Sequence, residues 1–274
     1  VMDADFFRRY YQVWRVRKSE IDLHIANWDE AGYEMPSGIA TWPGNGNAGN
    51  GEPTLLAPFA DLDGDGLYEP EQGEHPIIRQ DEALWYVGCS LSYRGDARPD
   101  PDGMHPHLSA EIQVMHYGNA NAGDPNVFNT VHTNYQIINR GLETWNDVRF
   151  GEFTDFDIGC LVDDRVGCDS TLNLFFAFNG DGEDDNCGDP SIQFGAEPRA
   201  QGTIYLNHAL TAHRYIPESL VPLADLMDGT QNGQPFTTPG YPTHFQYPGG
   251  VWTEESDGLS PGDRRSIGTI GPFT

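Results

Sequence analysis

Apolar and polar positions alternate along three segments in the middle of the chain, as they do in strands that bury one face. The segments are EIQVMHYG (111–118), TVHTNYQIIN (130–139) and TWNDVRFGEFTDF (144–156). NRGLET (139–144) predicts a hairpin turn, and TLNLFFAFN (171–179) and IYLNHAL (204–210) predict further strands. Short strands at this spacing favour a β-sandwich. We therefore expect a mainly β fold with a sandwich-like core over residues 81–216.

The segments on either side of this core predict less regular structure. Residues 1–80 are expected to form a lead-in, in which FFRRYYQVWRVRK (6–18) alternates like a strand and SEID, from Ser19, matches a capping box that opens a short helix. Ile21, Ile25 and Trp28 would line the buried face of that helix. Residues 32–53 are rich in Gly, Asn and Pro and predict a long loop. Residues 217–274 predict mostly loop, ending in a strand that leads into a further region.

Charge limits the possible partners. Among 274 residues, 42 are acidic and 15 are basic, so the formal net charge is −27. Such a chain repels phosphate backbones and anionic membranes, which excludes nucleic acid as a partner. No apolar run approaches the ~20 residues of a membrane span, and the first residues lack the apolar core of a signal peptide, so we expect no membrane insertion and an origin inside a longer polypeptide. Acidic residues that cluster would repel one another unless a cation neutralises them.

The clearest cluster is DLDGDGLYEPEQGE, which resembles half of an EF-hand loop. Asp61, Asp63 and Asp65 alternate, and Gly66 supplies the sharp turn that lets oxygen atoms converge on one Ca²⁺. The twelfth position is a glutamine, so the closing ligand is expected to be Glu71 or Glu74, with the carbonyl of Leu67 also available. The alternative is a solvated Asp-Gly turn.

A second cluster, TDFDIGCLVDDRVGCD, predicts another calcium site within one loop. Its candidate ligands are Asp155, Asp157, Asp163, Asp164 and Asp169. The stretch NGDGEDDNCGD lies one strand later and offers acids that would complete this site, namely Asp181, Glu183, Asp184, Asp185 and Asp189. An exposed acidic loop is the alternative for both stretches.

The four cysteines form no CxxC pair, which argues against a zinc site. An even number of cysteines suits an oxidising compartment, and Cys160 and Cys168 bracket a short loop that a disulfide would close. The pairing of Cys89 and Cys187 stays open, and free buried thiols are the alternative. His105 and His107 alternate like ligands of zinc or copper, but no third ligand is evident.

Catalysis has no positive signal in the sequence. The GxSxG, HExxH and Cys-His patterns are absent, and no single carboxylate pair stands out for glycoside hydrolysis. Aromatic residues such as Trp85, Trp145 and Trp252 would stack on sugars in a carbohydrate-binding module, but core positions are the better prediction for Trp85, Trp145 and Phe150. A secreted glycoside hydrolase and a carbohydrate-binding module therefore remain as alternatives to a non-enzymatic surface protein.

Several runs together resemble one family of bacterial proteins. LLAPFADLDGDGLYEPEQGEHPIIRQDEALWYV, TNYQIINRG, VRFGEFTDFDIG and DDRVGCD are similar to large secreted proteins that Bacteroidota-type bacteria export by the type IX secretion system. The resemblance runs from about Trp14 to the terminal strand and carries over no catalytic residue. It implies export, an extracellular or cell-surface location, and a sorting domain that this chain lacks. Asp61, Asp63 and Asp65 match the family's Asp-rich loop, and Asp155, Asp157, Asp163 and Asp164 match its second acidic stretch.

The sequence as a whole predicts a secreted, calcium-binding segment of a cell-surface protein with a structural or adhesive role. Its expected partners are other copies of itself or other cell-surface proteins, with polysaccharide as a further candidate.

Overall fold

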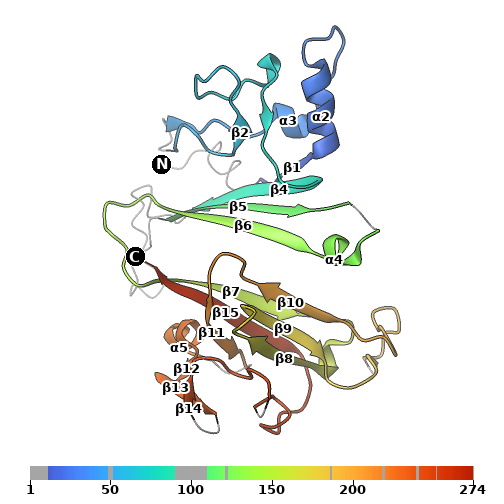
Figure 1. Cartoon of the computed structure of the whole chain (residues 1–274), viewed down its shortest axis with the longest axis vertical. Coiled ribbons are helices and arrows are strands. Elements are labelled where there is room, and N and C mark those ends of the chain that lie inside the picture. Colours follow the sequence, from blue (N-terminus) through green and yellow to red (C-terminus); the bar gives the residue numbers. More distant parts are fainter. Residues whose placement is uncertain are drawn as a thin grey trace. The chain divides into compact units, whose positions relative to one another are not determined.

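The chain folds into two compact units, residues 1–144 and 145–274, and is mainly β as predicted (Figure 1). The computed structural model describes residues 12–48, 52–89, 110–120, 123–185, 187–217, 220–238, 241–250 and 252–273. The boundary between the units lies inside the segment 81–216, which the sequence predicted as one core. The first half of that segment belongs to one unit and the second half to the other.

The first unit is built on an antiparallel sheet in the order β1-β4-β5-β6. Its strands are β1 (Trp14–Arg17), β4 (Glu82–Cys89), β5 (Ala110–Gly118) and β6 (Val131–Asn139). Trp14 pairs with Trp85 across β1 and β4, so part of the predicted lead-in is a strand of the sheet. The other elements of this unit are α2 (Lys18–Asn27), α3 (Ser37–Ala40), β2 (Phe59–Ala60), η2 (Pro70–Gln72), β3 (His75–Pro76) and α4 (Pro125–Phe128).

The core of the first unit lies between this sheet and the segments before it. Trp85 packs against Trp14 and Trp42, with ring centroids 5.6 and 6.0 Å apart, and Ile39 is fully buried beside them. The Gly-rich stretch 32–53 is therefore anchored by core side chains and contains α3. In α2 the buried side chains are Ile21 and His24, whereas Ile25 and Trp28, which were predicted to be buried, are exposed.

Helix α2 also begins earlier than the capping-box pattern at Ser19 predicted. Its N-cap is Arg17, whose backbone N–H donates to the Glu20 carboxylate at 2.8 Å. Glu20 therefore satisfies a free amide at the helix start, as an acid at the N3 position does.

The second unit is a small β-sandwich of two antiparallel three-stranded sheets, in the orders β10-β9-β8 and β11-β15-β7. Phe175 of β9 occupies the interface, where a Cβ on Gly268 of β15 would lie 2.4 Å from its ring. Phe156, Val166 and Leu210 complete the core around it. The strands are β7 (Val148–Phe156), β8 (Asp164–Asp169), β9 (Leu174–Asn179), β10 (Ala200–Ile204), β11 (Leu210–Tyr215) and β15 (Arg264–Phe273).

The second unit also contains smaller elements. They are η4 (Leu161–Asp163), α5 (Leu223–Asp228), β12 (Thr230–Gln231), β13 (Gln234–Thr238) and β14 (Tyr241–Thr243). Phe236 of β13 packs against Trp252, and Trp252 contacts Tyr247. The tail after residue 217 was predicted to be mostly loop, yet it supplies β15, the central strand of its sheet, at the predicted terminal strand.

Two local predictions in this unit are wrong. Residues 204–210 form a connection between β10 and β11, held by the Tyr205 hydroxyl, which donates to the Gly268 carbonyl at 2.8 Å. TDFDIGCLVDDRVGCD is not one loop, because η4 and β8 run through it. Asp164 and Cys168 therefore lie on a strand, and this separates the acidic residues that the sequence grouped together.

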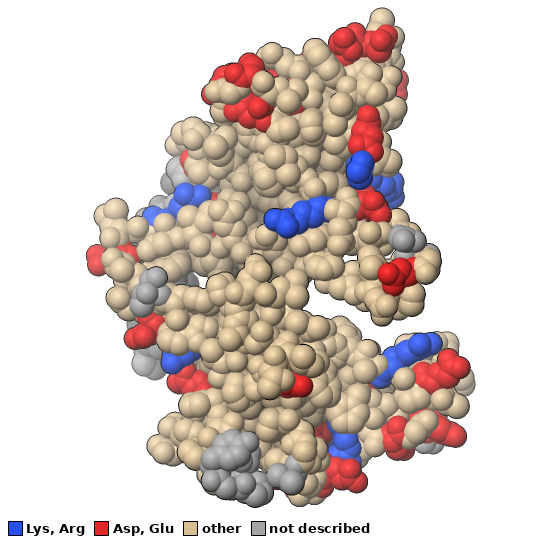
Figure 2. Space-filling view, in the orientation of Figure 1, with Lys and Arg blue, Asp and Glu red and all other residues tan. Residues whose placement is uncertain are grey.

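Acidic side chains gather in separate patches on the face of the molecule shown in Figure 2, with uncharged surface between them. None of the helices in the described ranges is long and apolar enough to cross a bilayer.

Candidate metal sites

The loop that contains Asp61, Asp63 and Asp65 brings three exposed carboxylates together, as predicted. One oxygen atom from each side chain lies within 4.8 Å of the others. Asp61 accepts hydrogen bonds from the N–H groups of Gly64 and Gly66 at 2.7 and 3.0 Å. Both glycines have a positive φ, +80° and +78°, a conformation that disfavours other residues. The backbone amides of the turn therefore fix the Asp61 carboxylate.

Glu74 fastens the two ends of this loop. One of its carboxylate oxygens accepts from the N–H of Leu62 and the other from the N–H of Glu69, each at 2.8 Å. The side chain is 2% exposed, so these two amides replace the water that the carboxylate loses on burial. Of the two predicted closing residues, Glu74 thus positions the loop, while Glu71 lies on the exposed η2 helix outside the group of three.

The second acidic stretch divides into three places. Asp155 and Asp157 converge with Asp263 on an exposed surface, where Arg265 already donates to Asp155 at 3.0 Å and to Asp263 at 2.6 Å. An arginine that bridges two carboxylates offsets the repulsion that would otherwise demand a cation. The prediction that Asp155 and Asp157 join Asp163 and Asp164 in one site is therefore wrong.

Asp169 lies at the far end of β8 from Asp164 and also leaves the predicted site. Its Oδ1 accepts from the N–H and hydroxyl of Thr171 at 2.8 and 2.6 Å, and these bonds lower the pKa of its carboxyl. Asp189 makes the same pair of bonds with Ser191 at 2.9 and 2.7 Å. Both residues cap turns, a common use of aspartate that needs no metal.

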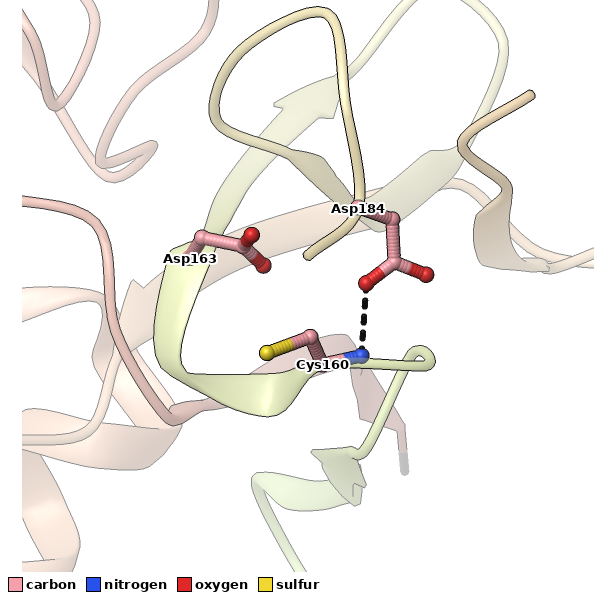
Figure 3. A group of neighbouring side chains, drawn as sticks. All are labelled: Cys160, Asp163 and Asp184. Atoms are coloured by element: carbon pink, nitrogen blue, oxygen red, sulfur yellow. Dashed lines mark hydrogen bonds between the residues drawn. The ribbon is translucent and has the colours of Figure 1, made fainter. Parts of the chain in front are cut away.

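Asp163, Asp164 and Asp184 instead form an acidic group in which Asp163 is half-buried and the other two are buried. Asp164 and Asp184 are 0% and 1% exposed. In Figure 3 the carboxylates of Asp163 and Asp184 and the thiol of Cys160 surround a common space, and one atom of each lies within 4.8 Å of the others. The stretch after β9 therefore contributes Asp184 to this group, as the sequence suggested.

Backbone donors fix Asp184 in place. Its two oxygens accept from the N–H groups of Cys160 at 2.7 Å and Phe194 at 2.8 Å. Gly159 makes this approach possible, because a Cβ there would lie 1.9 Å from the Asp184 carboxylate. The φ of Gly159 is +56°, so both conformation and space require glycine.

Three buried oxygen atoms near this group accept no hydrogen bond within the described residues: Asp163 Oδ1, Asp164 Oδ1 and Asn179 Oδ1. Asp163 and Asp164 are consecutive, and Asn179 is the partner of Asp164 across the β8–β9 ladder. Directly paired residues of neighbouring strands point to the same face of the sheet, so Asn179 lies beside Asp164. Buried polar atoms without a partner are rare and indicate a missing ligand or water.

The raised pKa values of Asp163 and Asp164 also indicate that this group lacks a positively charged partner. The pKa of Asp164 is raised to about 7, chiefly by burial and also by the charges of Asp163 and Asp184, against the opposing effects of the Ile158 N–H and Arg264. The pKa of Asp163 is raised by burial and by Asp184 and Asp181. A cation would relieve the cost of ionising Asp163 and Asp164 in this environment.

The predicted Cys160–Cys168 disulfide is not formed. Both thiols are free, and the Cys168 thiol contacts the carbonyl oxygen of Gln246 at 3.5 Å. Strand β8 causes the separation, since a strand rises about 3.3 Å per residue and carries Cys168 about 13 Å beyond Asp164. His105 and His107, which were weighed as transition-metal ligands, lie outside the described residues.

The aromatic residues that the sequence analysis named as candidates for stacking on sugars give little exposed surface. Trp85 and Trp252 are buried, and Trp145 and Phe150 are half-buried. A cavity of about 560 Å³ in the first unit is lined in part by Trp14, Trp42 and Tyr68. These rings are also buried, because they pack into the core of that unit.

Comparison of the chain with protein-family models, with curated proteins and with solved structures found no match.

Replacement of Glu74 with Gln is expected to loosen the aspartate loop even without metal. The amide keeps one acceptor oxygen but turns an N–H₂ group toward an amide donor, so one backbone N–H is left unsatisfied. The expected loss is about 1–3 kcal/mol in the free energy of unfolding of the first unit, measured by urea denaturation in excess chelator. Glu71→Gln makes the same chemical change on exposed η2 and serves as the control. Equal stability of the two variants would contradict this role for Glu74.

Proposed function

We propose that this chain is a calcium-stabilised β segment of an exported protein, with a structural or adhesive role at the cell surface. The observation that carries the calcium part is the set of three buried oxygens, on Asp163, Asp164 and Asn179, that accept no hydrogen bond from the described part of the chain. A buried carboxylate oxygen that lacks a partner costs free energy, and this cost is removed when a cation binds.

The chemistry of these atoms favours calcium over other ions. All three are hard oxygen atoms of carboxylate or amide groups, the ligands that Ca²⁺ accepts in sets of six to eight with flexible geometry. Mg²⁺ demands a stricter octahedron and gives up its water reluctantly. Zn²⁺ prefers nitrogen and sulfur ligands. Asp184, held by two backbone amides, supplies further negative charge beside the group.

The Asp61, Asp63 and Asp65 loop is the second calcium site of the proposal. Its carboxylates are exposed and already close, so a cation binds there with little rearrangement. Glu74 and the two glycines hold this geometry in advance, which lowers the entropic cost of binding. The carbonyl of Leu67, Glu71 and water molecules would complete the shell.

The proposed role at the cell surface rests on the fold and charge of the chain and on its resemblance to proteins exported by the type IX secretion system. A mainly β fold whose loops are held by an abundant extracellular ion suits a scaffold outside the cell. The net charge of −27 keeps such a scaffold soluble and makes its contacts dependent on cations. Its partners would be other copies of itself or other cell-surface proteins, with polysaccharide as a further candidate.

Calcium is expected to raise the melting temperature of the chain, with magnesium giving a much smaller rise. At a calcium concentration one hundred times the dissociation constant, the gain is about 2.7 kcal/mol per site. Asp63→Asn removes a charged ligand from the loop, and a tenfold weaker affinity would cut the gain at that site to about 1.4 kcal/mol. The measurement is thermal unfolding in calcium and in chelator. Asp189→Asn, which changes a turn-capping aspartate, controls for the lost charge. An equal calcium-induced rise in melting temperature in both variants would contradict the loop site.

Calcium affinity at the buried group is expected to depend on pH. Without metal, the folded-state pKa of Asp164 is about 7 and thus above its unfolded value, so its contribution to stability is present at low pH and is lost as pH rises toward 7. Calcium requires the ionised form. Its affinity should therefore rise by up to about tenfold per pH unit from pH 5 to 7 and level off above.

Calorimetric titration of the Asp63→Asn, Asp65→Asn double variant isolates the buried group for this measurement. Adding Asp164→Asn should remove most of the pH dependence. A flat profile in the double variant itself, or no calcium binding to it at any pH, would contradict a cation at the buried group.

Ordered assemblies on electron-microscope grids, formed in calcium and dispersed by chelator, are the result expected for a structural role. If the chain assembles equally well with and without calcium, the structural role does not depend on the ion. Retardation of the chain on polysaccharide affinity gels, without assembly, would favour a carbohydrate-binding module instead.

A further inference from the structure

Burial raises the pKa of the Cys160 thiol, and the neighbouring thiol of Cys187 raises it as well, so the two thiols are close together inside the second unit. Cys160 is fully buried at the start of η4, and Cys187 is half-exposed in the loop after β9. Independent contacts bring the same segments together. The Cys160 N–H donates to Asp184 at 2.7 Å, and the Asp185 N–H donates to Asp163 at 3.4 Å. Asp184 and Asp185 therefore lie beside the chain at 160–163.

We propose that Cys160 and Cys187 form a disulfide when the protein is in an oxidising compartment. The other described thiol cannot compete for Cys160. Cys168 lies on β8 with its sulfur against the Gln246 carbonyl, and a disulfide needs Cα atoms no more than about 7 Å apart. Cys89 belongs to the first unit, at the end of β4.

The difference in exposure between the two thiols determines which of them reacts first with an oxidant. Cys187 is accessible, so its thiolate attacks a disulfide oxidant, such as oxidised glutathione or the disulfide of a thiol oxidoreductase, and releases one thiol of that oxidant. Cys160 then gives up its proton to water and attacks the Cys187 sulfur, which releases the second thiol. The two protein thiols lose two protons and two electrons, one S–S bond forms, and the oxidant is reduced to two thiols.

The bond would fasten the loop after β9 to the start of η4. Asp184 lies between Cys187 and the point where that loop leaves β9, so the bond would keep its carboxylate beside Cys160 and Asp163. Oxidation also removes both thiols as metal ligands, which leaves only oxygen atoms around the shared space. The inference does not depend on calcium, because the two sulfur atoms are neighbours in the folded chain without a metal.

The test is disulfide mapping of the full chain. The protein is equilibrated in a buffer of reduced and oxidised glutathione, with calcium in one arm and chelator in the other. Free thiols are blocked with N-ethylmaleimide under denaturing conditions, and the digest is analysed by mass spectrometry without reduction. A peptide that links Cys160 to Cys187 in both arms, with Cys168 blocked, is the expected result. A link between Cys160 and Cys168, or complete blocking of Cys160 and Cys187, would overturn the proposal.

Matched variants test whether the disulfide stabilises the second unit. Reduction should lower the melting temperature of the second unit by about 10 °C in the unmodified chain and in Cys168→Ser. Cys187→Ser, at a half-exposed position that tolerates serine, should lose this response. If Cys160 and Cys187 instead resist alkylation only while stoichiometric zinc is bound, the pair is a metal site and the disulfide is refuted. Because the mapping is read in both arms, failure of the calcium proposal would leave this result unchanged.

Discussion

The structure depends on how it satisfies carboxylates that it removes from water. Each buried acid needs donors to replace its lost hydration, because an unpaired buried charge costs several kcal/mol. The chain has 42 acidic residues and only 15 basic ones, so arginine cannot serve them all. Arginine pairs with two buried glutamates, Glu111 with Arg140 at 2.8 Å and Glu254 with Arg264 at 3.0 Å. Elsewhere, backbone N–H groups of loops donate hydrogen bonds to the buried carboxylates.

Hydrogen bonds from backbone N–H groups to buried carboxylates explain why so many loops in this protein have defined shapes. Glu74 accepts from the amides at both ends of the aspartate loop, and Asp184 accepts from Cys160 and Phe194. Asp225 accepts from the Thr230 hydroxyl and from the amides of Asn232 and Gly233. In each case a carboxylate organises a loop by collecting its N–H groups. Asp163 and Asp164 are where this solution is incomplete, since each keeps a buried oxygen that no donor among the described residues reaches.

The sequence predicted those parts of the fold and sites that depend on neighbours in the chain. Strands β5, β6, β7 and β9 follow from alternation, and the aspartate loop follows from its spacing, because its donors and acceptors lie within a few residues. Strand β8 was missed, since DRVGCD is short and begins and ends with aspartate. That error grouped Asp155, Asp157 and Asp169 with Asp163 and Asp164. It also placed Cys168 near Cys160, because loop closure was argued from separation along the chain and not from the rise of a strand.

The sequence suggested that acids after β9 join the second site, but it could not show which of them do so or through which contacts with η4. Asp184 reaches Cys160 only because β8 and β9 form a hairpin that returns the chain to its starting edge. The same return brings Cys187 to Cys160, so a disulfide and a buried cation would restrain one pair of segments. Two restraints on one pair of segments remove much of the same conformational entropy, and their stabilising effects are therefore not additive. Whichever forms first has already removed part of that entropy, so the second adds less to the free energy of unfolding than it does when it is measured alone.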